Sequence, residues 1–179
     1  KRSAELARRV NIEVRSLEDA PRLDVAFDGA DEVTPDLSLT KGLGGALLRE
    51  RVVAAEADRF VVLVTPEKLV DKLGTRAPIP IEVVPFGWQQ TAEQIVAGTA
   101  AFVAGPVAAR RRGAADDPYR TDGRHYILDC TLGPIADAAG LAAFLDAQPG
   151  VVEHGLSLGL ASAALLGRGD QLETMGRMP

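Results

Sequence analysis

The sequence of 179 residues predicts an α/β fold, with an open, mostly parallel sheet and a smaller α+β domain inserted into it. Two observations support this prediction. Helical and extended patterns alternate through residues 3–73, which is typical of layered α/β proteins. Between the closely spaced Pro78 and Pro80 and the later pair Pro149-Gly150, the order changes to strand, helix, strand, strand, helix, strand, which is the split βαβ pattern.

The first part of the chain is expected to form a parallel, Rossmann-like sheet. Residues 60–64, Phe-Val-Val-Leu-Val, are continuously apolar and rich in β-branched side chains, as in a strand covered on both faces. Pro66 marks the start of the next helix, because proline is tolerated in a first helical turn. The expected elements are a helix over 3–10, strands over 11–14 and 23–27, a helix from 44 to about 58, a strand over 60–64 and a helix over 66–73.

The inserted region is expected to form a ferredoxin-like α+β domain. Its expected elements are a strand over 81–84, a helix over 89–101, strands over 107–111 and 126–130, a helix over 137–147 and a strand over 151–154. The apolar and small residues of 156–175 are expected to return to the first sheet. We therefore predict a Rossmann-like catalytic domain over 1–78 and 155–179, and a ferredoxin-like insert domain over 79–154.

Composition and charge narrow the function classes. Apolar residues make up 46% of the chain and charged residues 25%, and the net charge is −5. A negative balance argues against nucleic-acid and anionic-membrane partners, which need a basic surface. One cysteine permits no intramolecular disulfide, and two histidines are too few for a histidine-rich metal site. We expect a cytoplasmic protein without a bound metal, and we expect the charged stretch 110–117 to be a solvated loop.

Three carboxylates crowd the end of the predicted strand 23–27, in the segment Asp28-Gly29-Ala30-Asp31-Glu32. Ligands of open α/β sheets bind beyond the carboxyl ends of the strands, so Asp28 and Asp31 are expected to face a pocket. The same residue types are also common in solvated turns, and spacing alone favours that interpretation.

Glu50 is predicted to lie among apolar side chains on the helix that starts near Gly44, since a turn of about 100° per residue places it inside an arc made by Ala46, Leu47, Val53, Ala54 and Ala57. A carboxylate on an apolar face is costly unless it is paired or functional. Desolvation raises its pKa, as a general base working near neutral pH requires. A structural ion pair with a buried lysine or arginine is the alternative.

Two lysines are further candidates. Lys41 precedes the glycines of the segment Gly42-Leu43-Gly44, which allow close backbone approach at a helix N-terminus suited to an anion. Lys68 follows the buried strand 60–64 closely and is expected at the same edge of the sheet. An exposed lysine is the simpler interpretation of each. Taken together, these candidates predict metal-free proton transfer on a polar, anionic small molecule.

The motifs resemble those of type A ribose-5-phosphate isomerases. The resemblance rests on Asp28-Gly29-Ala30-Asp31-Glu32, on Lys41-Gly42-x-Gly44 leading to Arg49-Glu50, and on Lys68 before Val70-Asp71-x-Leu73-Gly74. It extends through Pro80-Ile81-Glu82-Val83 and the segment 149–156, and so covers nearly the whole chain. Leu43 departs from the family pattern, in which a glycine is common.

The resemblance implies a cofactor-free aldose–ketose isomerase that interconverts ribose 5-phosphate and ribulose 5-phosphate through a cis-enediol(ate), with Glu50 as the base. It implies roles in ring opening for Asp28, in holding hydroxyls for Asp31 and in stabilising the enediolate for Lys41. It further implies a homo-oligomer. The sugar-binding residues would be Asp28, Gly29, Ala30, Asp31, Lys41, Gly42, Leu43, Gly44 and Lys68.

Members of this family begin with a Gly-Thr-Gly-Ser/Thr-type phosphate loop, which the sequence from Lys1 onward is expected to lack. This leaves two alternatives to an active isomerase. One is a sugar-phosphate-binding regulatory module of the same fold. The presence of the complete set of aspartates, lysines and glutamate argues against this alternative. The other is an inactive truncated paralogue.

Overall fold

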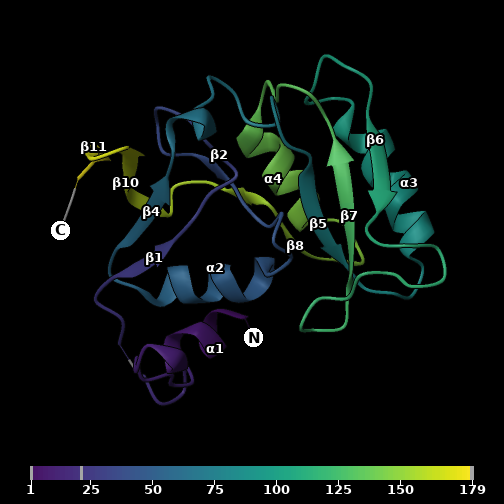
Figure 1. The fold of residues 1–179 in the computed structure, drawn as a ribbon. Helices are drawn as coiled ribbons and strands as arrows, with labels where there is room; N and C mark the ends of the chain where they lie inside the picture. The colour runs from purple at the N-terminus through teal and green to yellow at the C-terminus, as the bar shows by residue number, and fades with distance from the viewer. Residues whose placement is uncertain (1, 21, 178–179) are drawn as a thin grey trace.

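The computed structural model describes residues 2–20 and 22–177 (Figure 1). Its main sheet has four strands in the order β1-β4-β10-β11. Strands β1 and β10 are both parallel to β4, whereas β11 is antiparallel to β10. The mostly parallel sheet is confirmed, as is the return of the C-terminal segment to it. The strands are β1 (Ala26–Asp28), β4 (Phe60–Val64), β10 (Ala161–Arg168) and β11 (Gln171–Gly176).

One helix of the main domain directly precedes the central strand β4 in the chain. Helix α2 (Leu47–Glu56) lies along one side of the main sheet in Figure 1, with α1 (Arg2–Arg9) below it. The buried Ala54 of α2 packs into the same core as Phe60 and Val62 of β4. Leu63 of β4 is 51% exposed, so the expectation that both faces of this strand are covered is wrong at that position. Within residues 2–20 and 22–177, none of the helices combines the length and hydropathy needed to span a bilayer.

The insert forms a separate antiparallel sheet in the order β6-β7-β5-β8, with a second apolar core that includes Ile95, Leu141 and Leu145. The predicted order of strands and helices is confirmed. We propose the division into 1–78 with 155–179 and 79–154 as the domain boundaries. The elements are β5 (Ile79–Val83), α3 (Trp88–Thr99), β6 (Ala108–Arg111), β7 (Tyr126–Thr131), α4 (Ala138–Asp146) and β8 (Val151–His154).

A third, small antiparallel sheet, which no sequence pattern indicated, joins the two larger ones. It consists of β2 (Glu32–Val33), β3 (Leu39–Thr40) and β9 (Leu156–Ser157), in that order. Strands of two residues are too short to show an alternating pattern. Because β9 directly follows the insert, this sheet holds the segment after Thr40 against the end of the insert.

Two expected elements differ from the structure. Residues 11–14 form no strand, and Ile12 and Val14 are exposed, because an alternating pattern cannot itself supply a neighbouring strand to pair with. The expected helix over 66–73 is a single 3₁₀ turn, η1 (Pro66–Lys68). The chain leaves the turn in an extended conformation at Leu69, and the N–H of Val70 donates to the carbonyl of Val33.

Glu32 stabilises the junction between the main sheet and the insert. Its side chain is fully buried and accepts hydrogen bonds from the backbone N–H groups of Gly74 (2.6 Å), Arg76 (2.5 Å) and Ala77 (3.2 Å). Glu32→Ala removes the acceptor for three amides, and an unsatisfied buried group costs about 1–3 kcal/mol. We therefore expect the free energy of unfolding to fall by about 3 kcal/mol or more.

Urea denaturation of the Glu32→Ala variant, compared with that of a Glu56→Ala control variant, tests this expectation. Glu56 is an exposed glutamate on α2, so its replacement should change stability by less than about 0.5 kcal/mol. Equal effects of the two substitutions would contradict the role assigned to Glu32.

Candidate active site

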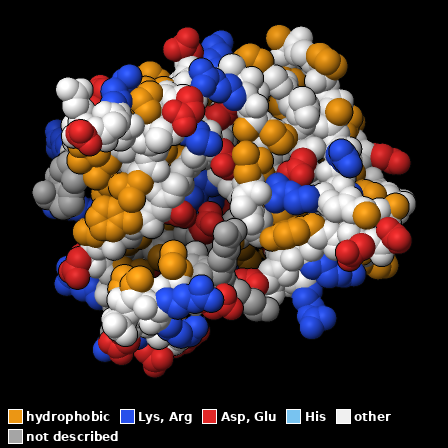
Figure 2. Space-filling view, in the orientation of Figure 1, with side chains coloured by type: hydrophobic (Ala, Val, Ile, Leu, Met, Phe, Trp, Pro, Cys, Tyr) orange, Lys and Arg blue, Asp and Glu red, His pale blue; other side chains and the backbone are white. Residues whose placement is uncertain are grey.

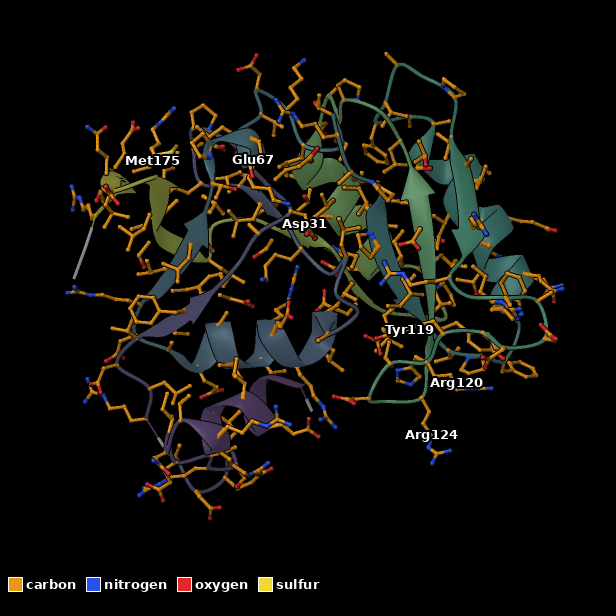
Figure 3. All side chains as sticks on the ribbon, in the orientation of Figure 1. Asp31, Glu67, Tyr119, Arg120, Arg124 and Met175 are labelled. Carbon is orange, nitrogen blue, oxygen red and sulfur yellow. The ribbon has the colours of Figure 1, made fainter. Side chains whose placement is uncertain are left out.

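The predicted site residues other than Leu43 and Lys68 converge in one cleft at the carboxyl end of β1. Asp28 is the last residue of β1, Lys41 directly follows β3, and Glu50 lies in the first turn of α2. The cleft has a volume of about 180 Å³. Figure 2 shows acidic and basic side chains together in a hollow near the middle of this face, and Figure 3 places Asp31 between the main sheet and the insert. The cleft is lined by Asp28, Gly29, Ala30, Asp31, Lys41, Gly42, Gly44 and Glu50.

Lys41 lies at the centre of the charged groups. Its Nζ donates to Asp28 Oδ2 (2.8 Å) and to the carbonyl of Gly29 (2.6 Å), and lies 3.4 Å from Glu50 Oε2. The side chain is only 11% exposed. The backbone N–H of Lys41 donates to the carbonyl of Gly155, which follows the last strand of the insert. The junction of the two sheets therefore fixes the ammonium group between two carboxylates.

Asp31 holds the glycine loop. Its Oδ2 accepts a hydrogen bond from the N–H of Leu43 (3.0 Å), and its own N–H donates to the carbonyl of Thr40 (2.7 Å). The side chain of Leu43 is 40% exposed and does not line the cleft. Leu43 thus contributes its backbone to the site. A leucine here is compatible with the loop, although the family pattern has a glycine.

Gly42 has a positive φ of 100°, and a Cβ at this position would lie 2.5 Å from Cγ of Leu47. The turn before α2 therefore requires glycine at residue 42.

The carboxyl group of Glu50 is partly sheltered, with 29% of the side chain exposed. Burial raises its pKa above the ordinary value, and the charges of Asp28 and Asp31 raise it further, while the ammonium of Lys41 lowers it. The expected apolar face is buried only in part, since Leu47 and Ala54 are buried whereas Ala46 and Val53 are exposed. The alternative of an ion pair is present as well, because Lys41 is its partner. A carboxylate of raised pKa is a stronger base than a free glutamate, which suits it to accept a proton from a carbon acid.

Lys68 does not line this cleft. It borders a neighbouring pocket of about 350 Å³ together with Thr65, Leu165 and Gly167, and the two pockets share Ala30. The expectation that Lys68 lies at the carboxyl edge of β4 is confirmed, but the structure separates it from the group around Lys41.

Sequence reasoning missed two arginines beside the site. Arg51, next to Glu50 on α2, pairs with Glu153 of β8 (3.2 Å) and donates to the carbonyl of Leu156. Arg112 belongs to the stretch expected to be solvated, which is wrong at this residue, because its side chain is only 18% exposed and it pairs with Asp129. Neither contact has a sequence signal, since its partners lie far away in the chain.

Comparison with known proteins places these motifs in a family. The model of the family described as ribose 5-phosphate isomerase A (phosphoriboisomerase A) matches residues 1–171. The chain belongs to this family. The resemblance inferred from the aspartate, lysine and glutamate motifs is thereby confirmed.

Curated relatives and solved structures agree with this assignment. The chain is 48% identical over 175 residues to ribose-5-phosphate isomerase A of Synechococcus sp. (strain JA-3-3Ab). The alignment covers 97% of this chain and 74% of the relative. It is 49% identical over 164 residues to the protein of the same name from Roseiflexus sp. (strain RS-1). That alignment covers 92% of this chain and 68% of the relative. These relatives favour an enzyme over a regulatory module or an inactive paralogue.

The fold matches in the same way. Ribose 5-phosphate isomerase A from Methanocaldococcus jannaschii superposes with a TM-score of 0.85 at 32% identity, covering 98% of this chain and 75% of that one. A further D-ribose-5-phosphate isomerase, solved in complex with phospho-erythronic acid, has a TM-score of 0.88 at 32% identity with the same coverage.

Proposed function

We propose that the chain interconverts D-ribose 5-phosphate and D-ribulose 5-phosphate, with Glu50 as the general base. The observation that carries this proposal is the carboxyl group of Glu50, whose pKa is raised and which lies 3.4 Å from Lys41 in a cleft lined by Asp28 and Asp31. Membership of the isomerase family and the phosphorylated ligand of a related structure support the choice of substrate.

The proposed chemistry is a proton transfer between neighbouring carbons of the open-chain sugar. Glu50 takes the proton from C2 of the aldose, the C–H electron pair forms a C1=C2 double bond, and negative charge collects on O1. The carboxylic acid then returns the proton to C1 as the O2 proton moves to O1, which leaves the C2 carbonyl of the ketose. C2 is oxidised while C1 is reduced, so the reaction needs no redox cofactor.

The other residues have supporting roles in this proposal. Lys41 balances the charge on the oxygens of the cis-enediolate, Asp28 assists ring opening, and Asp31 holds sugar hydroxyls. Lys68, in the pocket that adjoins the cleft, balances the charge of the sugar phosphate. The backbone of the segments 29–30 and 42–44 surrounds the sugar. The homo-oligomeric state and the cytoplasmic location stay predictions.

A turnover assay tests the function directly. Purified protein is incubated with ribose 5-phosphate, and ribulose 5-phosphate is followed by NMR, with phospho-erythronic acid as a competing ligand. We expect turnover that phospho-erythronic acid inhibits. Binding of phospho-erythronic acid without turnover would instead support the regulatory module. The absence of both binding and turnover would overturn the proposal.

The pH profile follows from the direction of the pKa shift. A base must be ionised to accept a proton, and the raised pKa of Glu50 means that it binds its proton at a higher pH than a free glutamate. The midpoint of the acid limb of kcat/KM should therefore lie above about pH 4.3, which is the ordinary pKa of glutamate. Rates measured across the acidic range check this. A limb at or below the ordinary value would contradict the assignment.

A further inference from the structure

Arg112 of the insert touches the glycine loop of the main domain. Its Nε donates to Asp129 Oδ2 (2.9 Å) and its Nη2 to the second carboxylate oxygen, so the ion pair is bidentate and charge-assisted. The remaining Nη1 donates to the carbonyls of Gly42 (3.3 Å) and Leu43 (3.1 Å). All three nitrogens of the guanidinium group are thus used, two on the insert and one on the loop that lines the cleft.

These contacts fix how two peptide groups of the loop are turned. In a trans peptide, the C=O and the following N–H point in opposite directions. The peptide between Gly42 and Leu43 is held at both ends, because Arg112 binds its carbonyl and Asp31 accepts its N–H at 3.0 Å.

The next peptide, between Leu43 and Gly44, is held by Arg112 at its carbonyl. The N–H of Gly44 therefore points away from Arg112, and Gly44 lines the cleft. Among residues 2–20 and 22–177, no acceptor is present for this N–H. Arg112 thereby leaves one amide of the loop free to donate to an oxygen of a bound sugar.

A second contact from the insert reaches the same loop. The hydroxyl of Tyr119 donates to the carbonyl of Gly45 (3.4 Å), and its ring lies under the guanidinium of Arg112, 5.7 Å away. A Cβ on Gly45 would lie 2.1 Å from that hydroxyl oxygen. Figure 3 shows Tyr119 beside the end of α2 that faces the insert. The close approach means that the insert and the glycine loop fit one another at this point.

We propose that Arg112 is a positioning residue for the isomerisation, which holds the sugar-binding loop in its active geometry from the insert domain. This inference rests on the proposed function. Arg112 does not line the cleft, so it acts through Gly42, Leu43 and Gly44 rather than on the sugar. A lysine cannot replace it, because an ammonium group lacks the planar fork that binds a carboxylate and two carbonyls at once.

The test compares Arg112→Met with Arg111→Met. Arg111 is a matched control, since it too donates to two backbone carbonyls, those of Ala114 and Ala115, but within its own loop. A displacement of about 1 Å at a reacting group can cost about 100-fold, so we expect kcat of Arg112→Met to fall about 10- to 100-fold. Arg111→Met should keep the wild-type kcat.

Further readouts separate positioning from a general loss of structure. The acid limb of kcat/KM should stay in place in Arg112→Met, because Arg112 does not contribute to the pKa shift of Glu50. Millimolar guanidinium should restore part of the kcat of Arg112→Ala. If Arg112→Met does not fold, Asp129→Asn, which keeps the arginine but weakens its ion pair, should show a smaller fall in kcat.

The outcomes distinguish this proposal from the function on which it rests. If wild type and Arg111→Met turn over ribose 5-phosphate and Arg112→Met matches them, the positioning role is wrong and the proposed function stands. If wild type shows no turnover, the proposed function fails, and the role of Arg112 fails with it.

Discussion

The Glu50→Gln variant should lose nearly all isomerase activity but keep its affinity for the sugar phosphate. A positioned general base contributes about 10²- to 10⁴-fold, and the amide cannot accept the proton, so we expect kcat to fall by about that factor. The substitution keeps the size of the side chain and leaves Lys41 paired with Asp28 at 2.8 Å. Affinity for phospho-erythronic acid, measured by calorimetry, should therefore change little.

Glu56→Gln is the matched control for this prediction. Glu56 lies on the same helix but is exposed, so the same chemical change there should leave kcat and affinity unaltered. A parallel loss of kcat in both variants would indicate damage to α2 rather than loss of a base. A normal kcat in Glu50→Gln would contradict the proposed mechanism.

Lys41→Met should have the second largest effect, and it should also move the pH profile. Loss of a group that stabilises an oxyanion costs about 10²- to 10³-fold in kcat, and we expect a fall of that size. The ammonium of Lys41 lowers the pKa of Glu50, whereas burial and the nearby aspartates raise it. Removing the ammonium should raise that pKa further, so the acid limb of kcat/KM should move to higher pH.

Kinetics of Lys41→Met and Lys72→Met across the acidic range test this pair of effects. Lys72 is exposed and lies outside the cleft, so its replacement should leave both kcat and the acid limb unchanged. An acid limb of Lys41→Met that stays in place or moves to lower pH would contradict the electrostatic account.

The sequence predicted the elements whose pattern is local and long enough to read. The apolar run of β4 and the alternating helices and strands of the insert are confirmed, because burial on a sheet imposes a pattern over several residues. The strand expected over 11–14 is wrong, since pairing depends on a neighbour that the pattern does not reveal. The same limit hid the two-residue strands of the small sheet, one of which ends just before Lys41.

For the site, position at the end of a strand was the informative signal. Asp28, Asp31 and Lys41 meet at the cleft because the carboxyl end of β1 and the end of β3 lie together there. Arg112 could not be predicted in this way. Its contacts with Gly42 and Leu43 depend on how the insert packs against the main domain, which no local pattern of charge encodes.

Hydrogen exchange at the substrate tests the central claim most directly. Ribulose 5-phosphate is incubated in D₂O with wild type, Glu56→Gln and Glu50→Gln, and deuterium at C1 is followed by NMR. The account predicts exchange with wild type and Glu56→Gln, and none above the uncatalysed rate with Glu50→Gln. Exchange by Glu50→Gln at the wild-type rate would show that another group carries the proton.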